Sequence, residues 1–249
     1  MFNFFVEEEN LQQNVFYIMG NDYNHIKNVL RMQVGDKFLV SCNGVSNLCR
    51  LQGFTTNAVL AEILEENYQN TELCTKIYLF QGIAKGEKME WIIQKCVELG
   101  CFEIIPTEMS RCVVKIEEKK KRAKQSRWQA ISESAAKQSK RTVIPAVLEP
   151  MSFKNALNYA KDLDLLLVPY ENERGMVATK EALEAIKNGS KIGIFIGPEG
   201  GFAEAEIEAL TSLSGKTISL GSRILRTETA AITAVSMCML YTEMNGENE

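Results

Sequence analysis

Hydrophobic residues follow two different patterns along this chain, and the change falls near residue 70. Before that point, apolar runs of strand length are broken by tight-turn signals such as Asn43-Gly44, as in antiparallel strands. A short strand is expected at 2–6 and a short helix at 22–31. The polar segment 66–72 reads as a linker. We therefore expect a small β-rich domain over residues 1–70.

Beyond the linker, strand-like and helix-like segments alternate, which predicts a second domain over residues 74–246. Short apolar runs such as KIYLFQGIA (76–84) are followed by segments with apolar residues at helical spacing. In the segment 88–100, Trp91 is one of the apolar residues at helical spacing, so it is expected on the buried face of the helix. Helices are expected at 88–100, 117–139, 153–161, 177–187, 203–213 and 228–243. Such alternation predicts an α/β fold, a mostly parallel sheet with helices on both faces.

Ligands of such sheets bind beyond the carboxyl ends of the strands, and three loops at these ends hold the candidate chemistry. The loops are VPYENERG (168–175), IGPEGGF (196–202) and LGSRILRTETA (220–230). Glycine lets a backbone approach a ligand closely, because it has no Cβ and tolerates positive φ. Thr227 is expected to cap the last helix. A plain network of ion pairs among the charged loop residues is the alternative interpretation.

Several common ligands are excluded by the motifs. Gly215-Lys216-Thr217 would end a phosphate-binding loop only with glycine at position 210, where Leu210 stands. No GxGxxG fingerprint of dinucleotide-binding proteins occurs at the glycine turn. The one histidine, His25, makes a histidine-based metal site improbable, so no metal is expected. The seven cysteines form no CxxC pair and are expected as buried, reduced thiols.

The charge is unevenly distributed along the chain. The whole protein carries a net charge of -4, whereas residues 115–141 hold ten Lys or Arg and three Glu, a net +7. A basic stretch on an acidic protein is typical of a surface that binds RNA phosphates. The other interpretation is a solvated helix face. No apolar run is long enough to span a membrane, and the N-terminus lacks the pattern of a signal peptide, so a cytoplasmic protein is expected.

The two glycine- and arginine-containing loops, in this order and spacing, resemble the SPOUT class of methyltransferases, which have a trefoil-knotted fold. Within the class, the chain resembles the RsmE family. Supporting segments run over the whole length: HIKNVLRMQVGD (25–36), KGEKMEWIIQKCVELG (85–100), RCVVK (111–115) and RWQAISESAAKQSKR (127–141). This chain departs from the family pattern at two places. The family has arginine near residue 3, where this chain has Asn3. The family also has proline at the position of Ser222.

The resemblance implies S-adenosylmethionine-dependent methylation of N3 of one uridine in the 16S rRNA of the 30S subunit. It also implies a homodimer, a PUA-like RNA-binding β-barrel over residues 1–70, and a bent cofactor pocket formed by the three loops. The expected cofactor-binding residues are Pro169, Ile196, Gly197, Gly200, Gly201, Leu220, Gly221, Ser222, Ile224, Leu225 and Thr227. The expected RNA-binding residues are Arg31, Lys115, Lys119, Lys120, Lys121, Arg122 and Arg141.

Methylation at uracil N3 removes a proton and leaves negative charge on the flanking carbonyl oxygens. Arg226 is expected to orient the base and stabilise that charge, since arginine is always ionised and presents a planar fork of donors. Glu199 or Glu228 is expected to accept the proton, and each of them has orienting Arg226 or capping a helix as an alternative role. A SPOUT enzyme acting on another rRNA or tRNA position, or a non-catalytic ribosome-binding factor, remains as an alternative function.

Overall fold

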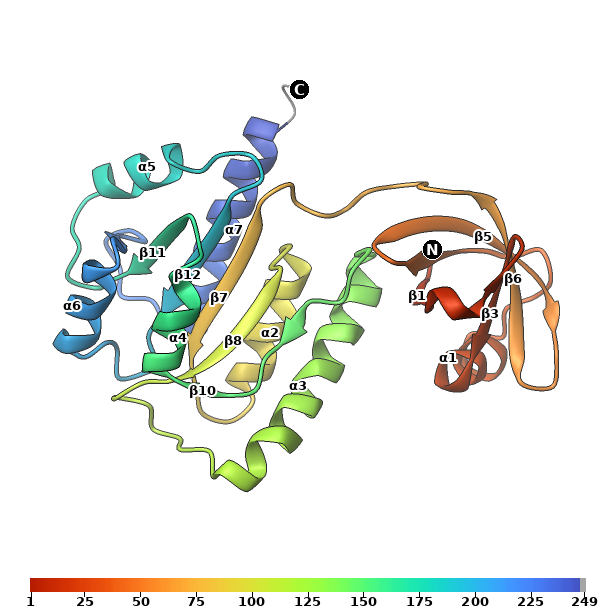
Figure 1. Cartoon of the computed structure of the whole chain (residues 1–249), viewed down its shortest axis with the longest axis horizontal. Helices are drawn as coiled ribbons and strands as arrows, with labels where there is room; N and C mark the ends of the chain where they lie inside the picture. The colour runs from red at the N-terminus through yellow and green to blue at the C-terminus, as the bar shows by residue number, and fades with distance from the viewer. Residues whose placement is uncertain (247–249) are drawn as a thin grey trace. The chain divides into compact units, whose positions relative to one another are not determined.

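The computed structural model describes residues 1–246, which form two compact units (Figure 1). The first unit comprises Met1–Glu72 together with Ala136–Ile144. The second comprises Leu73–Ala135 and the chain from Pro145 onward. The long helix α3, Glu118–Ser139, therefore contributes residues to both units. Nothing in the hydrophobic pattern separates residues 136–144 from the second unit.

The first unit is a curled six-stranded sheet in the order β1-β4-β5-β6-β3-β2. All of its strand pairs are antiparallel except β1 with β4, as the turn signals predict for most of this region. The strands are β1 (Asn3–Phe5), β2 (Leu11–Gln12), β3 (Val15–Met19), β4 (Lys37–Cys42), β5 (Val45–Phe54) and β6 (Ala58–Glu65). The short helix predicted at 22–31 lies slightly earlier, as α1 (Gly20–Asn24) followed by a π-helical turn (His25–Val29). A 3₁₀ turn spans Glu8–Asn10.

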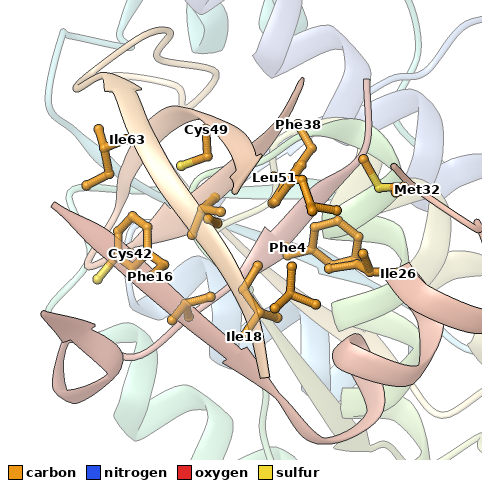
Figure 2. Close-up of a cluster of buried hydrophobic side chains, with 14 residues drawn as sticks. Phe4, Phe16, Ile18, Ile26, Met32, Phe38, Cys42, Cys49, Leu51 and Ile63 are labelled. Atoms are coloured by element: carbon orange, nitrogen blue, oxygen red, sulfur yellow. The ribbon is translucent and has the colours of Figure 1, made fainter. Parts of the chain in front are cut away.

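One hydrophobic cluster fills the concave side of this sheet (Figure 2). Alternate residues of β4, namely Phe38, Val40 and Cys42, belong to the cluster, as the two-residue repeat of a strand requires. Phe16 and Ile18 of β3, a strand near the other edge of the sheet, also belong to the cluster. These strands therefore contribute one face each to a shared core.

The second unit contains a seven-stranded sheet in which every strand pair is parallel. The order is β10-β8-β7-β12-β11-β13, with β9 also pairing with β8, so the chain crosses over several times. The strands are β7 (Lys76–Gly82), β8 (Glu103–Glu108), β9 (Ala146–Val147), β10 (Met151–Ser152), β11 (Leu165–Pro169), β12 (Lys191–Ile196) and β13 (Lys216–Ile218). The predicted parallel α/β sheet is confirmed.

Helices cover both faces of this sheet, with α4 and α7 on opposite sides (Figure 1). The helices are α2 (Lys88–Glu98), α4 (Phe153–Ala160), α5 (Val177–Glu184), α6 (Glu204–Ser212) and α7 (Thr227–Gly246). On the α4 face, the rings of Phe80 and Phe195 stack with centroids 4.2 Å apart. Trp91 does not join the buried face of α2 as its spacing indicates: its side chain is 45% exposed. Within residues 1–246, no helix is long and apolar enough to cross a membrane.

Candidate active site

A cavity of about 380 Å³ lies within the second unit, where the carboxyl ends of β11, β12 and β13 meet. The three loops predicted from the sequence form its wall, because parallel strands bring these ends to one edge of the sheet. The predicted cofactor residues that line it are Pro169, Ile196, Gly197, Gly201, Leu220, Gly221, Ser222, Ile224, Leu225 and Thr227.

Gly200 is the predicted cofactor residue that does not line the cavity. A Cβ placed on Gly200 would lie 2.9 Å from Cβ of Arg111, and the Arg111 guanidinium donates to the Gly200 carbonyl over 3.2 Å. Gly200 therefore lies against the loop that follows β8 rather than the cavity. Its role is to let that loop approach the glycine turn.

The glycine turn packs tightly on the end of β7. A Cβ added to Gly82 would lie 2.6 Å from the backbone nitrogen of Pro198, a distance that real Cβ atoms do not reach. Gly201 has φ of +68°, a left-handed conformation that favours glycine. Gly201 is thus needed for the shape of the turn, and Gly82 for the close packing of the turn on the sheet.

Thr227 joins the glycine turn to the arginine loop. Its hydroxyl donates to the carbonyl of Gly197 over 2.6 Å and accepts from Gln81 Nε2 over 2.9 Å. The prediction that Thr227 caps the last helix is wrong, because its hydroxyl is used in this tie. Arg226 takes the capping position instead, and its carbonyl accepts the first helical bond, from the amide of Ala230 at 2.8 Å.

A second tie fixes the arginine loop from the other side. The buried Thr179 hydroxyl donates to the Ser219 carbonyl over 2.8 Å and accepts from the Ser219 amide over 3.0 Å. Gly221 follows with φ of +106°. The loop is therefore held at both ends, and residues 222–226 form the segment that crosses the cavity wall.

Three charged side chains cluster beside the glycine turn. Lys88, at the start of α2, lines the cavity, and its ammonium lies 3.1 Å from Glu199 and 3.9 Å from Glu228. Burial alone would raise the pKa of Glu199, but the amides of Lys85 and of Glu199 itself, together with Lys88, hold it below its ordinary value. Glu199 lines the cavity, whereas Glu228 does not. These pairs involve Lys88, which the alternative interpretation did not include, whereas the loop arginines Arg223 and Arg226 form no salt bridge within residues 1–246.

Arg226 differs from these paired charges. Its side chain is exposed and lines the cavity, and within residues 1–246 it forms no hydrogen bond or salt bridge. Arg223 and Arg174 line the same cavity. An unpaired guanidinium at the mouth of a cavity is available to an anionic or electron-rich ligand.

The predicted RNA-binding residues divide into four groups. Arg141 is 3% exposed and its guanidinium is bonded to the carboxylate of Glu72, so it cannot reach RNA, and the sequence-based assignment is corrected. Lys121 is held by Glu108 and Glu118. Lys119 and Lys120 form exposed pairs with Glu117. Among the described residues, the side chains of Arg31, Lys115 and Arg122 form no salt bridge.

The sequence-based prediction missed Lys88. The available signal was its place at the first turn of the helix that follows β7, whose carboxyl end borders the glycine turn. Asn3, where the family pattern differs, is buried in the first unit and donates to the carbonyl of Arg141 over 2.9 Å. Within residues 1–246, no three His, Cys, Asp or Glu side chains gather as metal ligands would.

Comparison with known proteins places this geometry in a family. The RNA methyltransferase domain family matches residues 71–239, and the RNA methyltransferase PUA domain family matches residues 18–64. Ribosomal RNA small subunit methyltransferase E of Bacillus subtilis (strain 168) is 41% identical over 233 residues, covering 92% of this chain and 91% of that protein. The protein of the same name from Mesomycoplasma hyopneumoniae (strain 232) is 34% identical over 96% of this chain and 99% of its own length.

A solved structure agrees with this assignment. The crystal structure of a ribosomal RNA small subunit methyltransferase E from Neisseria gonorrhoeae bound to S-adenosyl methionine has a TM-score of 0.81 and 30% identity. The match covers 96% of this chain and 97% of that one. Fold and site together define an RNA methyltransferase of the SPOUT, trefoil-knot class with an N-terminal PUA domain. Within that class, the chain belongs to the ribosomal RNA small subunit methyltransferase E (RsmE) family.

Proposed function

We propose that this protein methylates N3 of a uridine in the 16S rRNA of the 30S subunit, with S-adenosylmethionine as the methyl donor. The observation that carries the proposal is the cavity bounded by the glycine turn and the arginine loop, with the unpaired Arg226 at its wall. The names of the relatives support small-subunit rRNA as the substrate class. The choice of uracil N3 follows from the RsmE resemblance.

The residues of the cavity fit the proposed cofactor. Its volume of about 380 Å³ lies within the range of small-molecule sites. The backbones of Gly197, Gly201 and Gly221 border it without side chains, so main-chain groups can contact an adenosine directly. Leu220, Ile224 and Leu225 add apolar walls for the base. When bound, S-adenosylmethionine supplies an electrophilic methyl group.

Arg226 has the principal role towards the uracil in this proposal. Its free guanidinium donates to a uracil carbonyl oxygen and stabilises the negative charge that appears as the N3 proton leaves. Of the two predicted proton acceptors, Glu199 is the one that lines the cavity, so it takes the N3 proton in this proposal, although its lowered pKa makes it a weak acceptor. Glu228 lies outside the lining, so a role in orientation suits it better than direct proton transfer.

The proposed RNA contacts are the exposed, unpaired Lys115 and Arg122 in the second unit and Arg31 in the first, with Lys119 and Lys120 adding weaker contributions. A homodimer is part of the proposal. It is supported by apolar side chains left exposed in the second unit, Trp91, Leu240 and Met244. A cytoplasmic location follows from a ribosomal substrate.

The test uses 30S subunits from cells lacking this enzyme, incubated with the protein and methyl-labelled S-adenosylmethionine, followed by digestion to nucleosides and chromatography. Label in 3-methyluridine is the expected result. Label in another nucleoside would favour a SPOUT enzyme with a different target. Absence of label on 30S subunits, naked 16S rRNA and tRNA would favour a non-catalytic ribosome-binding factor.

A further inference from the structure

Lys88 connects three elements at the wall of the cavity. It is the first residue of α2, and its ammonium lies 3.1 Å from Oε1 of Glu199 on the glycine turn. The same ammonium lies 3.9 Å from Oε2 of Glu228, in the first turn of α7. The amide of Lys85 also donates to Glu199 Oε1, over 3.0 Å, so the start of α2 is attached to the glycine turn twice.

Glu228 depends on this lysine for compensation of its charge. Its side chain is 11% exposed, and within the described residues its Oε2 atom has no hydrogen-bond partner. A buried carboxylate without donors is unfavourable unless a cation lies nearby. Among residues 1–246, Lys88 is the cation within salt-bridge distance, and the N-terminal end of α7 adds a favourable dipole.

The position of Glu228 bears directly on Arg226. The two residues are separated only by Thr227, whose hydroxyl is tied to Gly197. Displacement of Glu228 would therefore turn the start of α7 about this tie and move Arg226, which lines the cavity. The tie through Thr227 would still hold the glycine turn, and with it most of the cofactor wall.

We propose that Lys88 is a positioning residue for methyl transfer, which joins Glu199 and Glu228 so that Arg226 is held in place at the cavity. This inference rests on the proposed function, and it assigns to Lys88 a role that neither the glycine turn nor the arginine loop provides. Removal of the ammonium leaves two neighbouring carboxylates facing one another, one of them buried. Their repulsion moves Glu228 away from Glu199, turns the start of α7 about the tie between Thr227 and Gly197, and misplaces Arg226.

A second lysine on the same helix offers a matched control. Lys95 pairs with Glu98 at 2.9 Å, and the two side chains are 34% and 27% exposed, close to the 36% and 22% of Lys88 and Glu199. This pair does not line the cavity. Lys95→Met therefore removes an equivalent ion pair from α2 without touching the site.

The experiment measures kcat, KM for 30S subunits, the Kd for S-adenosylmethionine and the Tm of Lys88→Met, Lys88→Arg, Lys95→Met and the double variant Lys88→Met/Glu228→Gln. We expect Lys88→Met to lower kcat by at least about tenfold with Kd changed less than about threefold. Lys88→Arg should recover most of the loss. The double variant should exceed Lys88→Met in kcat, because it leaves no unpaired buried carboxylate.

The proposal is overturned if Lys88→Met keeps a kcat within about twofold of the wild type, or if Lys95→Met loses as much. A lower kcat that follows a lower Tm, with no rescue by Lys88→Arg or by the double variant, would make Lys88 a purely structural residue and equally overturn it. The product that the wild-type protein forms in the same assay distinguishes failure of the proposed function from failure of the proposed role of Lys88. Label in a nucleoside other than 3-methyluridine rejects the proposed target, while the variants are still compared on that product.

Discussion

Two glutamates, one in each unit, have side chains that are similarly exposed, 20% and 22%, and show how burial of the partner cation decides what an ion pair does. In the first unit, Glu72 accepts from the guanidinium of Arg141, which is 3% exposed, and from the amide of Thr142 at 2.9 Å. In the second unit, Glu199 accepts from Lys88, whose side chain is 36% exposed and lines the cavity. The first pair is sealed between chain segments distant in sequence, and the second remains open to a ligand.

This difference shows that a basic residue within a basic stretch of sequence does not have to lie on the surface. Arg141 ends the basic stretch, yet it attaches residues 136–144 to the first unit through Glu72. Asn3 and Ser41 extend this attachment, since Asn3 donates to the carbonyl of Arg141 and Ser41 donates to Asn3 over 3.1 Å. Lys88 lies in a less basic segment but contributes to the cavity. Charge density along the chain does not reveal which role applies.

The largest effect on stability should come from breaking the sealed pair. Arg141→Met leaves the carboxylate of Glu72 without its cation, and breaking a buried pair costs about 3–5 kcal/mol. We expect lower hydrogen-exchange protection of the β1 and β4 amides and a lower Tm. Arg50→Met is the control: Arg50 pairs with Glu62 at 2.7 Å, but its side chain is 48% exposed, so the loss should be at most about 1 kcal/mol. Equal losses in the two variants would contradict the distinction drawn from burial.

Arg226→Ala should have the largest effect on catalysis with little effect on stability. Its guanidinium has no partner among the described residues, so its removal leaves no buried charge behind. Loss of one transition-state donor costs about 10²–10³ in kcat. Single-turnover methylation of 30S subunits, beside a thermal melt, measures both quantities. Near-normal turnover would remove Arg226 from the proposed mechanism.

The comparison also indicates which features can be predicted from sequence. The strand–helix alternation and the glycine and arginine loops are local patterns, so the parallel sheet and most of the cavity lining follow from them. The hydroxyl of Thr227 and the glycine at 200 depend on contacts made far along the chain, with Gly197 and Arg111, and a local pattern cannot supply these. The burial of Arg141 has the same origin, since its partner Glu72 lies 69 positions away.

Within the basic helix, the comparison predicts unequal effects of neighbouring residues on RNA binding. Lys121 is held by Glu108 and Glu118, whereas the exposed Arg122 forms no salt bridge within residues 1–246. Arg122→Ala should weaken binding to 30S subunits a few-fold and reduce the slope of log K against log salt by about 0.7–0.9, the change for one phosphate contact. Lys121→Ala should change the slope less. Filter binding at several salt concentrations measures both, and equal slopes would show that intramolecular pairing does not limit RNA contact.

The smallest effect concerns Glu103, a partly buried carboxylate that has no salt bridge within residues 1–246. Glu103 accepts from the hydroxyl of Tyr159 at 2.5 Å, and burial raises its pKa although this hydrogen bond partly opposes the rise. A raised pKa means that the folded state binds the proton more tightly than the unfolded state. The stability that this gives is present below the ordinary glutamate pKa and is lost as the pH rises through the raised value.

Glu103→Gln keeps an acceptor for Tyr159 but cannot ionise, so it should remove this loss. At neutral pH we expect a change within about 0.5 kcal/mol, and the informative quantity is the slope with pH. Urea unfolding at a series of pH values, from the ordinary glutamate pKa upward, should show the wild type losing stability relative to the variant. Parallel curves would mean that burial of this carboxylate has no cost in the folded protein.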